Sequence, residues 1–357
     1  MENQTVREVA VIGSGSWATT IACLVAKNII WIPYYNSTVK IYVREEEEEV
    51  GNKSLAEILS TQRENVKYLP GFTIPSNVLV ETDIIQATKN ADVIIFAVPH
   101  KFLEETCKCI AGRIKQSVVG LSLIKGLIAK DGKLELGSDV IRRVLGIEVS
   151  VLMGATFASE VAAEELAEAT LGCSSPEVAH LFSTLLKSNY FCLTCINDVT
   201  TVELCGALKS IVACAAGFID GLGYGENVKA AVVRLGLVEM VWFTRMYYPG
   251  AKLRTFLENC GVGDLVASCY GHRDWLAAKY FITGKVFSKL EENVLKGQVI
   301  HGPETAALVY GFLKGKELEY KFPLFAAVHK IWTNEVNPTD LIDLVRNHPA
   351  YENAELQ

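Results

Sequence analysis

The chain has 357 residues, of which 50% are hydrophobic and 21% are charged, and its formal net charge is −7. This length exceeds what one hydrophobic core usually serves, so we expect two domains with a ligand cleft between them. A negatively charged chain lacks the broad positive field that nucleic acids and anionic membranes require, so neither is an expected partner. An anionic ligand would therefore have to be bound locally.

The ten cysteines lie scattered between Cys23 and Cys269, without the density of a disulfide scaffold, and this favours reduced thiols in a cytoplasmic protein. Cys192 and Cys195 form a single pair without a second pair or a nearby histidine, so we expect no metal site. No stretch of about 18 uncharged apolar residues predicts a membrane span, and the N-terminus does not resemble a signal peptide. These features predict a soluble, cytoplasmic, metal-free protein.

In the first half of the chain, short apolar runs alternate with helical stretches, which is the pattern of β-α units wound into a parallel sheet. From about Asp198 the pattern changes to long helical stretches, and Thr200 to Glu203 has the spacing of a capping box. We therefore predict an α/β domain over residues 1–197 and an all-helical domain over residues 198–357. The predicted strands cover residues 9–12, 39–43, 93–98, 118–124 and 149–153.

A glycine turn follows the first predicted strand and precedes the first predicted helix. Its spacing is that of a dinucleotide-binding turn, with alanine as an allowed substitute at the third glycine position. Gly13 permits the tight turn, Gly15 leaves room for a pyrophosphate, and the helix N-terminus offers free N–H groups. An ordinary strand-to-helix turn is the alternative, but the context favours a Rossmann-type domain. The residues of the turn are Gly13, Ser14, Gly15, Ser16, Trp17 and Ala18.

Arg44 and Glu45 follow the second predicted strand, where the choice of dinucleotide is usually made. An acid at this place binds the ribose 2′-hydroxyl of NAD, whereas an arginine can accept the 2′-phosphate of NADP. Arg44 could also stack on adenine. We therefore prefer NAD and leave NADP open.

Two lysines occupy positions where a charge is costly. Lys125 follows the apolar run 118–124, at the carboxyl end of a predicted strand, where open α/β sheets bind ligands. Lys209 is the only charged residue between Leu204 and Ile219, and burial there would lower its pKa. Such a lysine can donate and accept protons near neutral pH. The alternative is a lysine whose ammonium group extends to the surface.

A third group of polar residues lies between Cys260 and Asp274. Asp264 stands in an apolar turn flanked by glycines, and Arg273 can bind a phosphate with its planar guanidinium. The alternative is a pair of surface charges that cap helices. Separately, His301 in the polar loop 297–304 could form a hydrogen bond with a cofactor phosphate or ribose.

Together these segments resemble the eukaryotic cytosolic type of NAD-dependent glycerol-3-phosphate dehydrogenase over nearly the whole chain. The resemblance implies an N-terminal Rossmann domain, a helical C-terminal domain, a homodimer, and interconversion of sn-glycerol 3-phosphate and dihydroxyacetone phosphate. The segments that carry it, in chain order, are 13–18, 64–70, 98–100, 122–126, 151–155, 205–209, 229–231, 234–236 and 302–303.

The resemblance also implies roles for individual residues. Lys209 would accept the proton of the C2 hydroxyl, with Lys125 and Asp264 completing the polar site around that carbon. Arg273 would contact both the substrate phosphate and the cofactor. The implied substrate-binding residues are Lys125, Ser210, Ser268, Arg273 and Asp274, and the implied cofactor-binding residues are 13–18, Arg44, Phe102, Ala158, Arg273 and His301.

Several residues depart from the family pattern at the site itself. Ser210 has a shorter reach than the usual asparagine, and an unmatched buried partner typically costs about 1–3 kcal/mol. Asp274 also replaces an asparagine, and its carboxylate would repel a phosphate unless it turns away. The other departures are Ser16 and Ala18 for asparagine and glycine, Thr156 for asparagine, Ser268 for threonine, and Val299 and His301 for lysine and glutamine.

These departures leave two hypotheses of different classes. The first is an active dehydrogenase with altered rate or affinity, and the second is a catalytically weakened paralogue that binds dinucleotide in a regulatory or partner role. The four charged residues that are kept, Lys125, Lys209, Asp264 and Arg273, favour the active enzyme. A different small phosphorylated ketone as substrate is a third, lesser reading.

Overall fold

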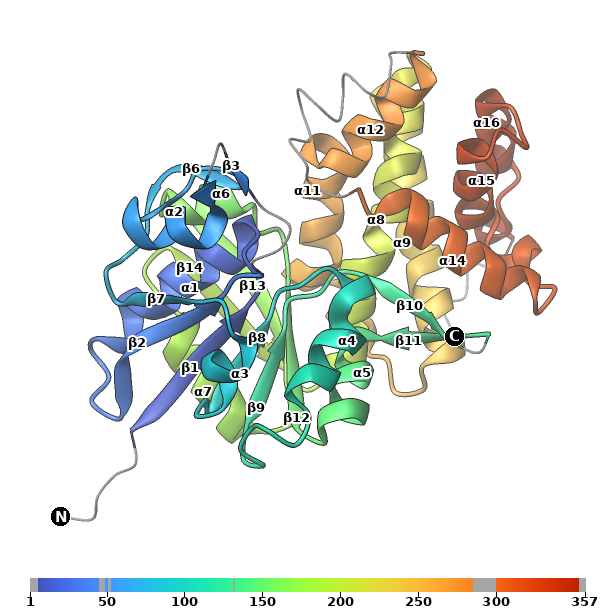
Figure 1. Ribbon diagram of the computed structural model, residues 1–357. Coiled ribbons are helices and arrows are strands. Elements are labelled where there is room, and N and C mark those ends of the chain that lie inside the picture. Colours follow the sequence, from blue (N-terminus) through green and yellow to red (C-terminus); the bar gives the residue numbers. More distant parts are fainter. Residues whose placement is uncertain (1–5, 45–48, 51–52, 131, 285–299, 353–357) are drawn as a thin grey trace. The chain divides into compact units, whose positions relative to one another are not determined.

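The structure is a computed structural model that describes residues 6–44, 49–50, 53–130, 132–284 and 300–352. The chain divides into two compact units (Figure 1). The N-terminal unit consists of Met1–Ile124 and Gly137–Val199, and the C-terminal unit consists of Lys125–Leu136 and Thr200–Gln357.

The N-terminal unit is built on an eight-stranded sheet in the order β14-β13-β12-β9-β8-β1-β2-β7. Six neighbouring strands, from β7 to β12, are parallel, whereas β13 is antiparallel to β12 and parallel to β14. This confirms the predicted α/β class. The strands are β1 Arg7–Ile12, β2 Tyr35–Tyr42, β7 Val78–Glu81, β8 Val93–Phe96, β9 Val119–Ser122, β12 Glu148–Met153, β13 Ala167–Gly172 and β14 Phe191–Ile196.

All five strands predicted from apolar runs are present, although β2 begins earlier than its apolar run. Of the other three strands, β14 coincides with the strand-like run 190–196 that contains Cys192 and Cys195. Strands β7 and β13 were not predicted, because each mixes apolar with exposed positions and so lacks the continuous apolar run of a central strand. Short strand pairs were also missed. They are β3 Glu49–Val50 with β4 Lys53–Ser54, and β5 Glu64–Asn65 with β6 Leu69–Thr73.

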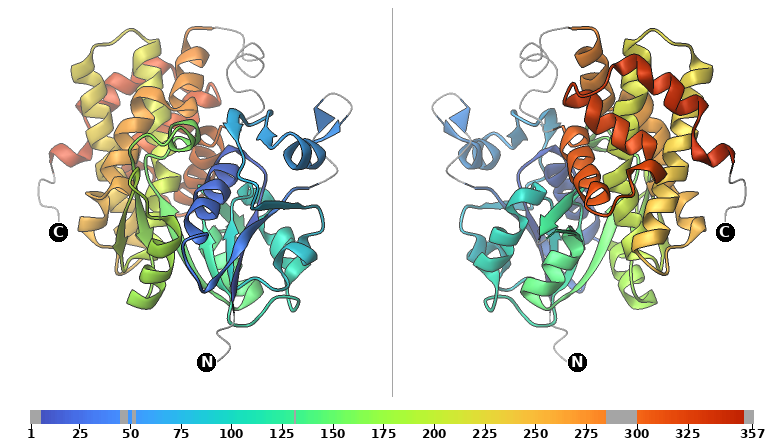
Figure 2. Two further views of the ribbon diagram at one scale, coloured as in Figure 1. Left: turned by 90° about the vertical axis from the view of Figure 1, so that its left-hand side faces the viewer. Right: turned by 90° about the vertical axis from the view of Figure 1, so that its right-hand side faces the viewer.

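Helices cover both faces of this sheet (Figures 1 and 2). Helix α1 contacts α6 and α7, and helix α4 contacts α3 and α5. Right-handed crossovers that leave β1 in opposite directions place their helices on opposite faces, which produces these two layers. The helices are α1 Ser16–Ile29, α2 Leu55–Thr61, α3 Ile84–Thr88, α4 His100–Ile110, α5 Gly137–Leu145, α6 Ala158–Ala162 and α7 Pro176–Leu186.

Strand β1 shows why the central strands read as unbroken apolar runs. Val9 and Val11 pack into the same buried cluster as Ile21 of α1 and Phe182 of α7. Ala10, which points to the other face, is also completely buried. Because both faces are covered, neither set of side chains is polar.

The C-terminal unit combines helices with one hairpin, formed by β10 Leu127–Lys130 and β11 Lys133–Leu136. Its helical character confirms the prediction for this part of the chain. The α-helices are α8 Val199–Gly221, α9 Glu226–Tyr247, α10 Leu253–Phe256, α11 Asp264–Gly271, α12 Arg273–Ile282, α14 Gly302–Lys314, α15 Pro323–Trp332 and α16 Leu341–Arg346; single turns are η1 Asn259–Gly263, η3 Glu319–Lys321, η4 Pro338–Asp340 and η5 Pro349–Tyr351.

Helix α8 is the buried helix of this unit, with every residue from Thr201 to Ile219 inaccessible. It starts at Val199, so Thr200 lies inside the first turn and is not the predicted N-cap. Among the described helices, α8 alone is long and apolar enough to pass a length-and-composition test for a membrane span, and its most apolar window is wholly buried in the protein. That window contains Lys209.

Glu239 of α9 fixes the C-terminal helices. Its carboxylate accepts hydrogen bonds from the backbone N–H groups of Leu324 and Phe325, at the start of α15, and lies 3.0 Å from Nε2 of His348. A carboxylate placed at a helix N-terminus satisfies N–H groups that have no partner inside the helix. Burial raises the pKa of Glu239, and the histidine and the two N–H groups oppose this effect.

Candidate functional site

The predicted glycine turn lies at the carboxyl end of β1, between β2 and β8. Gly13 has a φ of +128°, and a Cβ there would lie 2.5 Å from the carbonyl oxygen of Ala97. Only glycine fits, because the conformation is left-handed and the loop after β8 approaches the backbone closely. The strand order changes direction here, and this switch point is where open α/β sheets bind ligands.

Gly15 is glycine for a different reason. It is the N-cap of α1, and a Cβ built on it would meet no described atom within 4 Å. Packing within the protein therefore does not require a glycine at this position. A pyrophosphate bound against this backbone would require one, because a side chain would occupy its space. No described side chain caps the N-terminus of α1 and its first turn has no acidic residue, so its N–H groups suit an anion.

Asn65 supports the glycine turn through its side chain, a role that the resemblance of segment 64–70 does not assign. Its side-chain amide donates hydrogen bonds to the carbonyl oxygen of Ser14 at 2.9 Å and to Oγ1 of Thr19 at 2.8 Å. Asn65 is completely buried. Asn65 lies beside the glycine turn only in the folded protein. In the sequence 51 residues separate it from Ser14, so no local pattern indicates this contact.

The structure also brings together other predicted cofactor-binding residues of the N-terminal unit. The guanidinium of Arg44 lies 5.6 Å from the ring centroid of Phe102, in a cation–π arrangement. Ala158 begins α6, and its carbonyl oxygen accepts a hydrogen bond from Thr20 of α1 at 3.1 Å. Glu45, the acid that follows Arg44, lies outside the described residues.

In the C-terminal unit, Asp264 joins the two predicted catalytic lysines. Its Oδ2 accepts a hydrogen bond from Nζ of Lys125 at 3.0 Å, and its Oδ1 accepts one from Nζ of Lys209. Lys209 also donates to Oγ of Ser268 at 2.8 Å. Lys209 and Asp264 are 1% and 3% exposed, so neither the surface lysine nor the surface helix cap considered as an alternative is correct.

Burial controls the protonation of this cluster. It lowers the pKa of Lys209 to about 8, although Asp264 opposes the shift. Burial alone would raise the pKa of Asp264, but the charges of Lys125 and Lys209 hold it below its usual range. Asp264 is therefore ionised, and Lys209 can change its protonation near neutral pH.

The backbone before α11 explains the position of Asp264. Residues Asn259–Gly263 form a π-helical turn that leads into α11, with Asp264 as its first residue. A Cβ on Gly261 would lie 2.3 Å from the carbonyl oxygen of Phe256, so the turn packs too closely for any side chain at this point. The N-terminus of α11 also favours a carboxylate.

The remaining predicted substrate-binding residues lie on α8 and at the start of α12. Ser210 is 3% exposed and follows Lys209 directly on α8. Arg273 and Asp274 are the first two residues of α12, and the carboxylate of Asp274 is completely buried. His301 precedes α14, and its backbone N–H donates to Oδ1 of Asp274 at 2.8 Å. Val299 lies outside the described residues.

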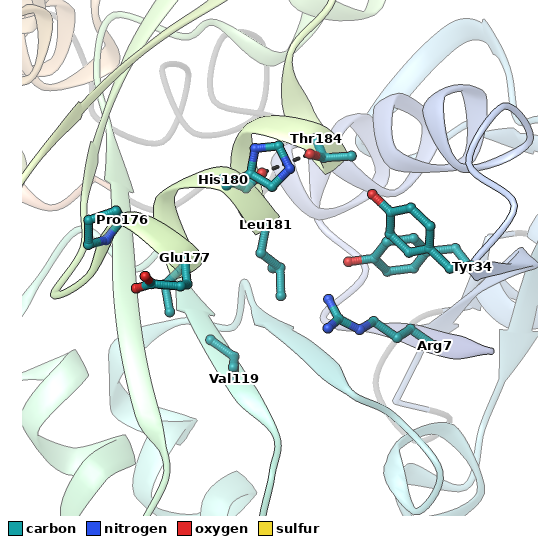
Figure 3. A pocket seen from close by; sticks show the side chains of 10 residues that line it. Arg7, Tyr34, Val119, Pro176, Glu177, His180, Leu181 and Thr184 are labelled. Atoms are coloured by element: carbon teal, nitrogen blue, oxygen red, sulfur yellow. Dashed lines mark hydrogen bonds between the residues drawn. The ribbon is translucent and has the colours of Figure 1, made fainter. Parts of the chain in front are cut away.

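A cavity of about 610 Å³ lies at the amino-terminal end of the strands, opposite to the end that carries the glycine turn (Figure 3). Its walls include Arg7 and Val119, the first residues of β1 and β9, together with Leu181 of α7. None of the predicted site residues lines it. It therefore has no part in the arrangement described above.

Two family models match the chain. The description "NAD-dependent glycerol-3-phosphate dehydrogenase N-terminus" matches residues 8–179, and the corresponding C-terminus description matches residues 198–343. The chain is 47% identical to the cytoplasmic glycerol-3-phosphate dehydrogenase [NAD(+)] of Drosophila ezoana, over 96% of this chain and 98% of the relative. It is 45% identical to the human protein of the same name, over 97% and 99%.

A solved structure agrees with these relatives. The glycerol-3-phosphate dehydrogenase of Saccharomyces cerevisiae is 36% identical to this chain and superimposes with a TM-score of 0.86. The likeness covers 95% of this chain and 99% of the yeast chain. The match thus extends over both compact units.

Proposed function

Because the chain belongs to the family of NAD-dependent glycerol-3-phosphate dehydrogenases, we propose a role for each part of its site in that reaction. The chain is an oxidoreductase of the cytoplasmic type with NAD as its cofactor, which confirms the resemblance seen in the sequence. It interconverts sn-glycerol 3-phosphate and dihydroxyacetone phosphate. The observation that carries the proposal is the buried cluster of Lys125, Lys209 and Asp264.

The glycine turn and the first turn of α1 bind the pyrophosphate of the dinucleotide. The uncovered backbone at Gly15 and the uncapped N-terminus of α1 fit this anion. Arg44 and Phe102 bind the adenosine end, where the guanidinium offers a flat cation for stacking. Ala158, Arg273 and His301 complete the cofactor contacts. When bound, the nicotinamide supplies or accepts a hydride at C2.

Lys209 transfers the proton at the C2 oxygen. In the reducing direction its ammonium group stabilises the developing alkoxide and then protonates it; in the oxidising direction its neutral amine accepts the hydroxyl proton. A pKa of about 8 lets the same side chain serve both directions near neutral pH. Lys125 adds a second positive charge, and Asp264 orients both lysines.

The substrate phosphate is bound by Arg273, together with Ser210, Ser268 and the backbone of Asp274. Arg273 is suited to this because its guanidinium matches a phosphate with two parallel hydrogen bonds. Residues 1–197 thus carry the cofactor and residues 198–357 most of the substrate contacts. We further propose that the chain forms a homodimer, as the family resemblance implies. We expect no nucleic-acid or membrane partner, because the net charge of the chain is negative.

The direct test is oxidation of NADH by the purified chain with dihydroxyacetone phosphate. We expect turnover with NADH, less with NADPH, and loss of about 10²–10⁴-fold in kcat for Lys209→Ala, the range for a general acid or base. Tight NADH binding without any turnover would overturn the proposal and favour the regulatory paralogue. Calorimetric titration with NADH measures this binding independently of catalysis.

A further inference from the structure

The carboxylate of Asp274 ties the start of α12 to the start of α14. Its Oδ1 accepts hydrogen bonds from the backbone N–H groups of His301 and Gly302, both at 2.8 Å. Its Oδ2 lies 3.0 Å from Nδ1 of His272. Oδ1 is thus hydrogen-bonded inside the protein, whereas Oδ2 lies within ion-pair distance of the histidine without a hydrogen bond to any described residue, and the side chain is fully buried. The carboxylate is therefore enclosed by the protein and inaccessible to solvent.

The start of α14 is in turn fixed against α8. A Cβ built on Gly302 would lie 2.2 Å from Sγ of Cys214, 3.0 Å from the carbonyl oxygen of Ser210 and 3.3 Å from Oδ1 of Asp274. Only glycine allows this approach. Asp274 is thereby held next to the segment of α8 that carries Lys209. The charge of Asp274 raises the pKa of Lys209, and the charge of Lys209 lowers that of His272.

In the sequence, Arg273 lies between His272 and Asp274. With His272 and Asp274 both fixed, the backbone of Arg273 and the direction of its Cα–Cβ bond are fixed as well. A long side chain that starts from a fixed point loses less conformational freedom when it binds a ligand. A fixed starting point is important at a phosphate site, because a small displacement of the binding group misorients the substrate and lowers the rate.

We propose that His272 and Asp274 are positioning residues for the substrate phosphate, which hold Arg273 in place by tying the first turn of α12 to the N-terminus of α14. This inference rests on the proposed function and assigns a purpose to the acid that replaces the usual amide at position 274. The carboxylate does not repel the phosphate, because two backbone N–H groups and a histidine surround it. It acts on the substrate only through Arg273.

The same unit contains a matched control. Glu239 also accepts two backbone N–H groups at a helix N-terminus and lies 3.0 Å from a histidine nitrogen, but it ties α9 to α15 and to His348. These hydrogen bonds and this ion pair of Glu239 involve none of Lys125, Lys209, Asp264 and Arg273. Its loss should affect folding alone.

The experiment compares Asp274→Ala, Asp274→Asn, His272→Ala and Glu239→Ala in the full chain. Melting temperature, kcat and the KM for dihydroxyacetone phosphate are measured for each variant. Inhibition by inorganic phosphate reports on the phosphate site alone. Calorimetric titration with inorganic phosphate gives the same information without turnover, so an inactive parent chain would refute the proposed function and still leave this inference testable.

We expect Asp274→Ala to raise both the KM and the inhibition constant for phosphate about tenfold, which corresponds to ~1.4 kcal/mol, with kcat changed much less. Asp274→Asn keeps an acceptor for the two N–H groups and should restore most of the affinity. His272→Ala should raise both constants as well, but by less. This variant tests the proposal if Asp274→Ala does not fold. Glu239→Ala should lower the melting temperature and leave both constants unchanged. Unchanged constants in the Asp274 and His272 variants, or equal changes in Glu239→Ala, would overturn the proposal.

Discussion

Lys209 and Asp264 form a buried ion pair although they are 55 residues apart in the chain. Lys209 lies in the middle of α8 and Asp264 begins α11. Removing two charges from water is costly, and a buried pair persists only where further hydrogen bonds complete it. Ser268 and Lys125 supply these bonds. The pair therefore sets the chemistry of the site and also its pH dependence.

The pKa of Lys209 predicts opposite pH profiles for the two directions. Burial brings that pKa to about 8, so the lysine is mostly protonated below this pH and mostly neutral above it. Reduction of the ketone needs the proton, and its kcat should fall as the pH rises through about 8. Oxidation of the alcohol needs the neutral amine, and its kcat should rise over the same range. Steady-state rates between pH 6 and 10 measure both.

Lys209→Arg is the control for this profile, since a guanidinium does not lose its proton in this range. Any residual activity of that variant should show no ionisation near pH 8. If the Lys209→Arg variant showed the same ionisation near pH 8 as the parent chain, another group would be responsible and the role of Lys209 would be refuted.

Asp264→Asn should move the same ionisation to lower pH. Asp264 raises the pKa of Lys209, so removing its carboxylate leaves burial and the charge of Lys125, which both lower that pKa, opposed only by the smaller effect of Asp274. Breaking a buried pair should also cost about 3–5 kcal/mol in unfolding free energy. The pH profile and a urea titration of the same variant measure the two effects.

Asp220→Asn provides the comparison for Asp264→Asn. Asp220 pairs with the buried Lys229 at 2.7 Å and accepts a hydrogen bond from Trp275, and it is not among the charges that shift the pKa of Lys209. The Asp220→Asn variant should be less stable than the parent chain, but its rate should still show the ionisation near pH 8. If the ionisation shifted similarly in both variants, a general loss of stability, and not the charge of Asp264, would control the pKa of Lys209.

Gly13→Ala and Gly15→Ala should separate folding from cofactor binding. A Cβ at Gly13 meets the carbonyl oxygen of Ala97 at 2.5 Å and forces a left-handed residue, so this variant should lose about 1–3 kcal/mol of stability. A Cβ at Gly15 meets no described atom, so its melting temperature should not fall. Its affinity for NADH should nevertheless drop, because the methyl group occupies the space of the pyrophosphate. Normal NADH binding by Gly15→Ala would contradict the proposed cofactor site.

Asn65→Ala should weaken NADH binding by loosening the glycine turn. The variant removes two donors from buried acceptors, the carbonyl oxygen of Ser14 and Oγ1 of Thr19, at a cost of about 1–3 kcal/mol. Asn77→Ala is the matched control, because Asn77 also donates two hydrogen bonds to backbone carbonyl groups, those of Ala26 and Ser37. Calorimetric titration with NADH should distinguish the two variants. Equal affinities would show that Asn65 has only a structural role.

The sequence by itself predicted the features whose cause is local. The apolar runs of β1 and β8 predict strands because both faces of a central strand are buried. Gly13 and Gly15 predict a phosphate-binding turn because backbone geometry near a strand and a helix depends on a few neighbouring residues. Lys209 could be singled out because it is the only charged residue between Leu204 and Ile219 of α8.

Only the tertiary structure decided which distant groups meet. Asn65 supports a turn 51 residues away, and Asp264 reaches Lys125 across 139 residues. Asp274 is satisfied by N–H groups 27 and 28 residues further along the chain. Hydrogen bonds and charges act over a few ångströms in space, whatever the separation in sequence. The sequence therefore determined which side chains were available for chemistry, and the packing of α8, α11, α12 and α14 determined their partners and their protonation.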